Sequence, residues 1–195
     1  VTASRNRRNL EESASELGEL GATVEEVSLP LMVHCGTITG TLINVESAMT
    51  YRDWIRERLH EFGHSNQIGL LTGALMPAQT YYKVQKLREL VRRQLFEALE
   101  SYDVLILPTS KSCAPRLEDY QVVTSKETAA VPPVMTRPFN LANAPALSVN
   151  CGFNSQGLPI GLQIGGRPFA EEMVLKVGHA YEQNTTWHTM RPPSA

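Results

Sequence analysis

Apolar residues recur at intervals of three and four in four stretches of this chain. Residues at these intervals share one face of an α-helix, so each stretch is predicted to be an amphipathic helix. The predicted helices run from Leu10 to Gly18 or Gly21, from 40 to 62 with an end at Gly63, from 79 to 100, and from Glu171 through Tyr181. The third of these helices has the clearest apolar stripe.

Other apolar runs are predicted to be β-strands. Residues 22–29 alternate well enough for a short strand. Residues 104–107 are continuously apolar, as expected for a strand that is covered on both faces. Residues 146–151 and 158–164 are β-rich and flank a glycine-containing loop, which predicts a hairpin. Helices and strands together indicate an α/β fold, and we expect a single domain over residues 1–195.

The sequence also predicts where other groups come close to the sheet. Gly161, Gly165 and Gly166 lack side chains in the second strand of the hairpin, where another segment of backbone can approach. The strand at 104–107 ends shortly before Thr109, and ligands in open α/β sheets collect beyond such carboxyl ends. Residues 110–136 hold several prolines and no sustained period, which favours an irregular cover over the site.

The charge balance argues against a nucleic-acid partner. The 195 residues carry 18 lysines and arginines against 20 aspartates and glutamates, so no positive field attracts phosphate backbones. No apolar run is long enough to cross a bilayer, and the three cysteines are too widely spaced for a disulfide framework. We therefore expect a cytoplasmic protein with no membrane partner. Because the first residue is valine, we also expect a piece of a longer protein.

Residues 60–64 match the His-Glu-x-x-His pattern of zinc hydrolases. In that pattern two imidazoles one helical turn apart, here His60 and His64, bind the metal and the glutamate, here Glu61, activates water. Gly63 lies inside the required helix and is expected to end it, and no third ligand is evident. The zinc hydrolase is therefore kept as a remote alternative.

Two cysteines lie beside groups that could activate a thiol. Cys35 follows His34, and Cys151 precedes Gly152 after a predicted strand. Adjacent residues on an extended segment point to opposite sides, and an unpaired cysteine is more often a small packed apolar residue. Both cysteines are expected to be packing residues.

The last third of the chain carries several family motifs. Residues 136–141 lead into Pro-Ala-Leu-Ser-Val at 145–149, and residues 157–166 read Gly-Leu-Pro-Ile-Gly-Leu-Gln-Ile-Gly-Gly. In this order they resemble the C-terminal part of the amidase signature family, serine hydrolases that cleave carboxamides. The resemblance extends over nearly the whole chain and implies the C-terminal part of that α/β fold, a mixed β-sheet flanked by helices.

The resemblance implies that the catalytic residues lie elsewhere. In this family a serine attacks the amide carbon, a second serine relays protons and a lysine acts as base. These residues come from a Gly/Ser-rich stretch and a lysine in the N-terminal half, and this chain has no Ser-Ser pair. No catalytic residue, metal or cofactor is therefore assigned. Thr109, Thr136 and Asn140 are the candidate substrate-binding residues, because their segments border the pocket in the family. The alternative is that they cap turns beside prolines.

Four positions depart from the family pattern. Glutaminase members usually place an acid before the position of Thr136 and an arginine after the position of Gly63, and this chain has neither. Without charges to hold a zwitterion, a less polar amide than glutamine is expected. Ala144 and Asn150 replace a usual glycine and proline, which alters the expected turns.

These observations predict the C-terminal portion of an amidase, inactive alone, whose partners are a small-molecule amide and the missing N-terminal catalytic half, or a second copy of itself. A non-catalytic scaffold or binding subunit that reuses the same half-fold is the alternative.

Overall fold

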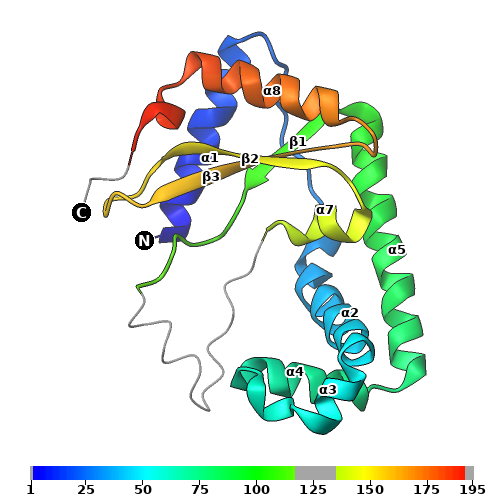
Figure 1. The fold of residues 1–195 in the computed structure, drawn as a ribbon. Coiled ribbons are helices and arrows are strands. Elements are labelled where there is room, and N and C mark those ends of the chain that lie inside the picture. The colour runs from blue at the N-terminus through cyan, green and yellow to red at the C-terminus, as the bar shows by residue number, and fades with distance from the viewer. Residues whose placement is uncertain (1, 117–134, 192–195) are drawn as a thin grey trace.

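A three-stranded antiparallel sheet forms the centre of the fold (Figure 1). The structure is a computed structural model that describes residues 2–116 and 135–191. The strands are β1 (Val104–Pro108), β2 (Ala146–Phe153) and β3 (Pro159–Gly166), in the order β1-β3-β2. Leu107 and Ser148 both pair with Gln163 on the central strand. Directly paired residues share one face of a sheet, so this register decides which side chains meet.

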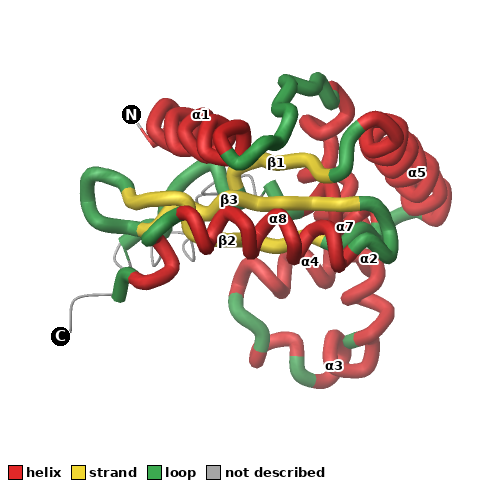
Figure 2. The backbone as a smooth tube through the Cα atoms, turned by 90° about the horizontal axis from the view of Figure 1, so that it is seen from above, coloured by secondary structure: helices red, strands yellow, loops and turns green. Residues whose placement is uncertain are grey.

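Two long helices cover one face of the sheet (Figure 2). They are α1 (Thr2–Glu19) and α8 (Glu171–Asn184), and both contact β2 and β3. The core between them is built from Leu17, Val149, Cys151, Ile160, Leu162, Ile164, Val174 and Tyr181. Inside it, the Tyr181 hydroxyl lies 3.0 Å from Ser13 Oγ, and Asn9 Nδ2 donates to the Cys151 carbonyl at 3.1 Å. These bonds satisfy polar groups that burial would otherwise leave unpaired.

Helices α5 (Ala78–Ser101) and α7 (Arg137–Ala142) pack on the other face. Their shared core consists of Leu95, Leu99, Leu105, Leu107, Phe139 and Ala142. The helix α2 (Cys35–Thr50), which follows the 3-10 turn η1 (Pro30–His34), packs against α5 and α7 through a third cluster. The chain therefore buries three connected apolar clusters around one sheet.

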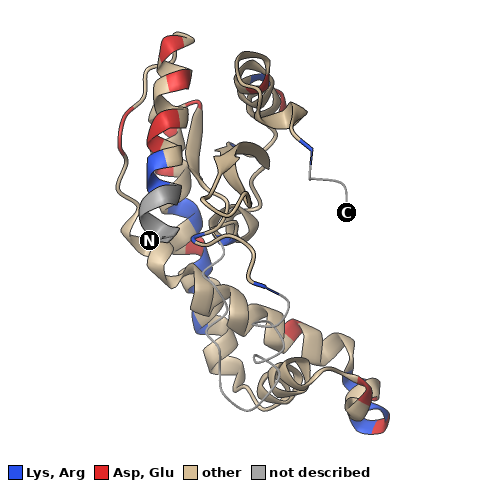
Figure 3. Cartoon of the chain, turned by 90° about the vertical axis from the view of Figure 1, so that its left-hand side faces the viewer, with Lys and Arg blue, Asp and Glu red and all other residues tan. Residues whose placement is uncertain are grey.

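The remaining helices extend away from the sheet. After α2 come α3 (Arg52–Glu57), the 3-10 turn η2 (Leu59–Glu61) and α4 (His64–Ala74), which packs back against α2. A last 3-10 turn, η3 (Trp187–Thr189), follows α8. Figure 3 shows charges on α1 and at the α3 end, whereas α2 and α4 are almost uncharged. Helix α4 contains no lysine, arginine, aspartate or glutamate, and Glu46 is the single such residue in α2.

The structure confirms most of the predicted elements. Helices α1, α5 and α8 and the β2–β3 hairpin lie where the apolar spacing placed them. Strand β1 is also present, with Leu105 and Leu107 buried and Val104 and Ile106 half-buried, so its two faces are covered unequally. The predicted cover falls largely on residues 117–134, outside the described residues.

The strand predicted over 22–29 is absent. Val27 and Leu29 do pack against the α5–α7 core, which explains the alternation. A strand also needs a neighbour for its backbone hydrogen bonds. In the described ranges, residues 23–28 form none with other backbone groups. The segment is therefore extended and one-sidedly buried without belonging to the sheet.

The helix predicted over 40–62 is divided into α2, α3 and η2. The backbone leaves helical geometry at Tyr51 (φ −98°, ψ 22°) and at Arg58 (φ −138°, ψ 23°). These breaks bring Tyr51, Trp54 and Phe62 together, with ring centroids 5.5 to 6.1 Å apart. Tertiary packing of three aromatic rings thus overrides the local helical pattern.

Candidate functional site

The end of β1 meets the start of α7, and this junction carries the candidate site. The Thr109 N–H donates to the Gly161 carbonyl at 2.8 Å, which extends the β1–β3 pairing by one residue. The Thr109 carbonyl accepts a hydrogen bond from Met135 N at 3.3 Å. Since Met135 directly precedes Thr136, the fold brings two of the three predicted site residues, Thr109 and Thr136, to one place.

A pair of hydroxyl groups crosses the central strand at this junction. Thr109 Oγ1 and Ser148 Oγ lie 2.6 Å apart, above Gly161 of β3. A Cβ at Gly161 would lie 2.6 Å from Thr109 Oγ1 and 2.9 Å from Ser148 Oγ. The predicted close approach at this glycine is confirmed, with the difference that side chains, and not backbone, occupy the space.

Gln163 lies two residues farther along β3 on the same face. Its side chain is 3% exposed, and its Oε1 has no hydrogen-bond partner in the described part of the chain. Beyond it, a Cβ at Gly165 would overlap the ring of Phe139 from α7. Three groups thus lie in a row along this face of β3: the Thr109–Ser148 hydroxyl pair, the buried amide of Gln163 and the ring of Phe139.

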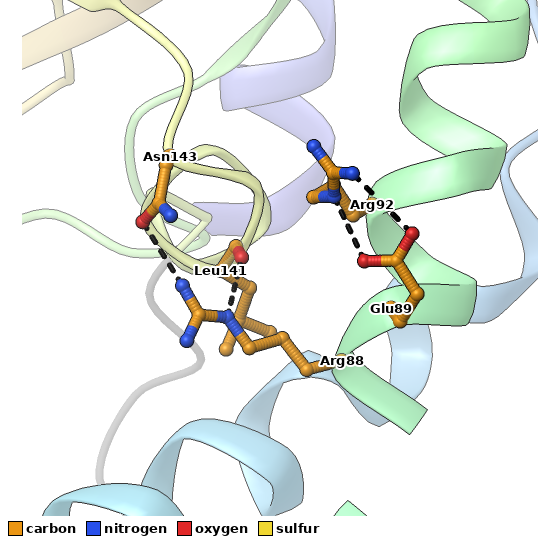
Figure 4. A network of polar contacts seen from close by, with 5 residues as sticks. All are labelled: Arg88, Glu89, Arg92, Leu141 and Asn143. Atoms are coloured by element: carbon orange, nitrogen blue, oxygen red, sulfur yellow. Dashed lines mark hydrogen bonds and ion pairs between the residues drawn. The ribbon is translucent and has the colours of Figure 1, made fainter. Parts of the chain in front are cut away.

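Helix α7 is held in place by Arg88 of α5 (Figure 4). Arg88 Nε donates to the Leu141 carbonyl at 2.7 Å, and Nη2 donates to Asn143 Oδ1 at 2.9 Å. Asn143 ends the helix in the left-handed conformation (φ 54°), which asparagine tolerates better than most residues. The positive φ therefore falls on Asn143, and Ala144, which replaces the usual glycine, needs none.

Thr136 and Asn140 lie one turn apart at the start of α7. The Asn140 N–H donates to the Thr136 carbonyl at 3.3 Å. The Thr136 side chain makes no capping hydrogen bond, so the capping role considered from the sequence does not apply to its hydroxyl. The Asn140 side chain is exposed, and no hydrogen bond to it occurs in the described ranges. Both side chains are therefore available to a ligand, and their role in binding stays a prediction.

Comparison with known proteins identifies the family. The profile of the family described as Amidase matches residues 2–175. The chain belongs to the amidase family. One subunit of the glutamyl-tRNA(Gln) amidotransferase of Rippkaea orientalis is 32% identical over 201 residues, covering 91% of this chain and 41% of that protein. The corresponding subunit from a Synechococcus strain is 40% identical over 143 residues, covering 71% of this chain and 27% of that protein.

A solved amidase has the same fold. Its crystal structure superposes with a TM-score of 0.78 at 27% identity, covering 91% of this chain and 41% of that one. The expected fold class, the α/β fold of the C-terminal part of the amidase signature family, is confirmed. The chain spans 41% or less of the length of the relatives named here.

The start of α7 also carries a cation that the sequence analysis missed. Arg137 lies between Thr136 and Pro138, and its Nη1 would be 2.9 Å from a Cβ on Gly36 of α2. The guanidinium forms no ion pair within the described ranges. The expectation of a less polar amide rested on two missing charges, an acid before Thr136 and an arginine after Gly63. Arg137 fills neither of these positions, so that expectation stays a prediction.

The two thiols are not activated. Burial raises the pKa of Cys35 to about 11, although the nearby Arg137 charge acts in the opposite direction. Burial likewise raises the pKa of the Cys151 thiol. Both groups therefore stay protonated at neutral pH, and a thiolate nucleophile is not available at either position. Their expected packing role is confirmed by their place in the buried clusters.

The zinc pattern at 60–64 is not formed as a helix. His60 lies in η2, Phe62 and Gly63 are extended (ψ 144° and 148°), and His64 begins α4. The two histidines are therefore not one helical turn apart on one helix. Glu61 is instead paired with Arg58 at 2.5 Å, and this pairing lowers the pKa of the carboxyl. Among the described residues, no group of three histidine, cysteine or acidic side chains is arranged to hold a metal.

Sequence reasoning missed Ser148, Gln163 and Arg137. The alternating pattern of the hairpin could have put Ser148 and Gln163 on the face opposite the apolar residues, but it could not have shown that they share that face with Thr109. Arg137 stood inside the Thr-x-Pro motif without a signal of its own. For the helices in the described ranges, none has the length and apolar character needed to span a bilayer.

Proposed function

We propose that this chain is the C-terminal portion of an amidase that hydrolyses carboxamide C–N bonds. In this proposal it supplies the sheet and walls of the substrate pocket, while the two serines and the lysine come from the N-terminal portion outside this chain. The observation that carries the proposal is the junction of β1, β3 and α7 in a chain that belongs to the amidase family. There Met135, the neighbour of Thr136, donates to the Thr109 carbonyl.

The proposed binding residues match the chemistry of a carboxamide. A carboxamide offers one carbonyl acceptor and, when unsubstituted, two N–H donors. Asn140 can donate and accept at once, and so can the hydroxyl of Thr136. Thr109 is already paired with Ser148 at 2.6 Å, so it would contribute through that pair. Because Arg137 adds a cation nearby, we specify the substrate only as a carboxamide and not by its polarity.

We also propose that the surface of α4 is covered by the N-terminal portion of the intact protein. Ile68, Leu71 and Leu75 recur at i, i+3 and i+7, and all three are exposed. Helix α4 already packs its other side on α2, so it is apolar on two sides and lacks charge. Exposed apolar stripes of this kind mark interfaces. The N-terminal portion is the proposed occupant because relatives extend well beyond the length matched here.

The proposed location is the cytoplasm, and the three free cysteines further support it.

The first prediction concerns activity with and without the N-terminal portion. The intact protein should hydrolyse a simple aryl carboxamide, and residues 1–195 alone should not, because the proposal places the two serines and the lysine outside this chain. Release of the amine product measures the activity. Enzymic turnover by residues 1–195 alone would contradict the proposal. An intact protein that binds amides without cleaving them would favour the scaffold alternative.

The second prediction concerns Asn140. In the intact protein, Asn140→Ala should raise KM by about 2- to 12-fold, because one hydrogen bond to substrate is worth about 0.5–1.5 kcal/mol. Thermal stability should stay nearly constant, because the lost side chain is exposed. Gln183→Ala, at an exposed position in α8 where the side chain makes no hydrogen bond in the described ranges, is the control and should leave both values unchanged. Loss of stability with unchanged kinetics would assign Asn140 to folding.

A further inference from the structure

Gln163 lies between two glycines on one face of the central strand β3. On the face toward α7, β3 presents Gly161, Gln163 and Gly165 in turn. The Thr109–Ser148 hydroxyl pair lies over the first glycine, and the Phe139 ring lies over the second. Between these two groups, Gln163 is the one residue of this row with a side chain. The hydroxyl pair and the Phe139 ring occupy the space over the two glycines, so they flank the amide of Gln163 on both sides.

This amide is buried without a partner for its oxygen. The side chain of Gln163 is 3% exposed, and Oε1 accepts no hydrogen bond from the described residues. The two neighbouring hydroxyls bond to each other at 2.6 Å and not to this oxygen. Because native proteins pair nearly all buried polar atoms, an orphaned acceptor at the centre of a site calls for a donor from outside the described chain.

The surroundings of Gln163 indicate which kind of donor this is. Its register partner Ser148 is exposed on the same face, although Gln163 itself is not. A substrate that enters and leaves on each turnover meets the exposed groups, Ser148 and Asn140, before it meets a buried oxygen. A donor that stays in place, such as a backbone N–H of a packed segment, suits the buried position better.

We propose that Gln163 is a positioning residue, whose Oε1 accepts a hydrogen bond from an N–H or O–H group of the N-terminal catalytic portion of the intact amidase. This inference rests on the proposed function, since it assumes that the catalytic portion packs against this face. The bond holds that portion against the strand that also carries the hydroxyl pair, so it sets the distance between the nucleophile and the pocket wall. Gln163 does not touch the substrate.

The test uses the intact protein with three variants. Gln163→Met removes the acceptor and nearly keeps the length of the side chain. Gln163→Glu keeps an acceptor oxygen at the same place in either protonation state. Gln156→Met makes the first change at an exposed position in the hairpin loop and serves as the control. For carboxamide hydrolysis, we expect Gln163→Met to lower kcat at least 10-fold with KM within 2-fold, Gln163→Glu to recover at least part of kcat, and Gln156→Met to match the unchanged protein.

A second measurement does not depend on activity. Hydrogen exchange of the intact protein should show a segment of the N-terminal portion that loses protection in Gln163→Met and keeps it in Gln156→Met. If the unchanged protein fails to cleave carboxamides but the two variants still differ in exchange in this way, the proposed function fails while the positioning role stands.

Other outcomes would overturn the inference. A raised KM with unchanged kcat would mean that Gln163 contacts the substrate. A lower melting temperature with unchanged kinetics and unchanged exchange in the N-terminal portion would mean a purely local structural role. Unchanged kinetics, stability and exchange in Gln163→Met would mean that an ordered water satisfies the oxygen.

Discussion

Replacing Phe139 with alanine is expected to lower the free energy of unfolding by about 3–5 kcal/mol, the usual cost of truncating a buried aromatic ring. Phe139 is 1% exposed and lies in the cluster shared by α5, α7 and β1. Its ring occupies the space over Gly165, so its loss leaves a cavity between α7 and the sheet. Urea unfolding of the intact protein, followed by circular dichroism, measures the change.

A double-mutant cycle makes this prediction specific. Gly165→Ala alone should destabilise the protein by about 1–3 kcal/mol, since the added Cβ overlaps the Phe139 ring. In the Phe139→Ala background the same change should cost far less, because the ring that it overlaps is gone. Two effects that add to within about 0.5 kcal/mol would show that the residues do not contact each other.

The cycle also connects stability to the site. Phe139 belongs to the short helix that carries Thr136 and Asn140, and Arg88 holds the other end of that helix through Leu141 and Asn143 (Figure 4). The ring therefore fixes one side of α7 and the arginine fixes its end. Variants at Phe139 should lose activity at temperatures below their unfolding transition, because the ring packs α7 against the sheet.

The second large effect is expected at Gly73, where α4 crosses α2. A Cβ at this position would overlap the carbonyl group of Asn44, which is backbone and cannot rotate away. Gly73→Ala should therefore destabilise the protein by about 3 kcal/mol, at the upper end of the usual cost of overpacking. This cost opposes the gain of roughly 1 kcal/mol that alanine brings to a helix interior. Thermal unfolding of the intact protein, with urea unfolding as a second measure, tests this value.

Gly40 provides the matched control for Gly73. It lies inside α2, and a Cβ there would meet no heavy atom within 4 Å. Gly40→Ala should therefore stabilise the protein by about 0.5–1 kcal/mol through helix propensity alone. If Gly73→Ala were to stabilise the protein as much as Gly40→Ala does, α2 and α4 would not cross as closely at Gly73 as described here.

The proposed N-terminal portion would account for two features of the described surface. Helix α4 and its C-cap residue expose Ile68, Leu71 and Leu75. Gln163 buries an acceptor that lacks a donor among the described residues. Exposed apolar area and an unpaired buried acceptor both cost free energy, and a portion that packed on these side chains would remove both costs. The two observations are independent, since one concerns apolar area and the other concerns a single hydrogen bond.

The sequence by itself determined the local elements and the family. The intervals in α1, α5 and α8 and the glycine-containing hairpin loop depend on neighbours in the chain, which a one-dimensional pattern records. The order of the motifs was likewise enough to indicate the amidase family, because residue identities at fixed separations do not depend on folding.

Only the tertiary structure decided how these elements combine. The alternation at 22–29 reported burial correctly, yet it could not show that no strand lies alongside in the described ranges. The apolar spacing at 40–62 could not foresee that Tyr51, Trp54 and Phe62 would break the helix by packing together. The Thr109–Ser148 pair and the orphaned Gln163 follow from strand register, which joins residues far apart in the chain. Such contacts depend on the packing of residues that are far apart in the chain, so local sequence patterns cannot predict them.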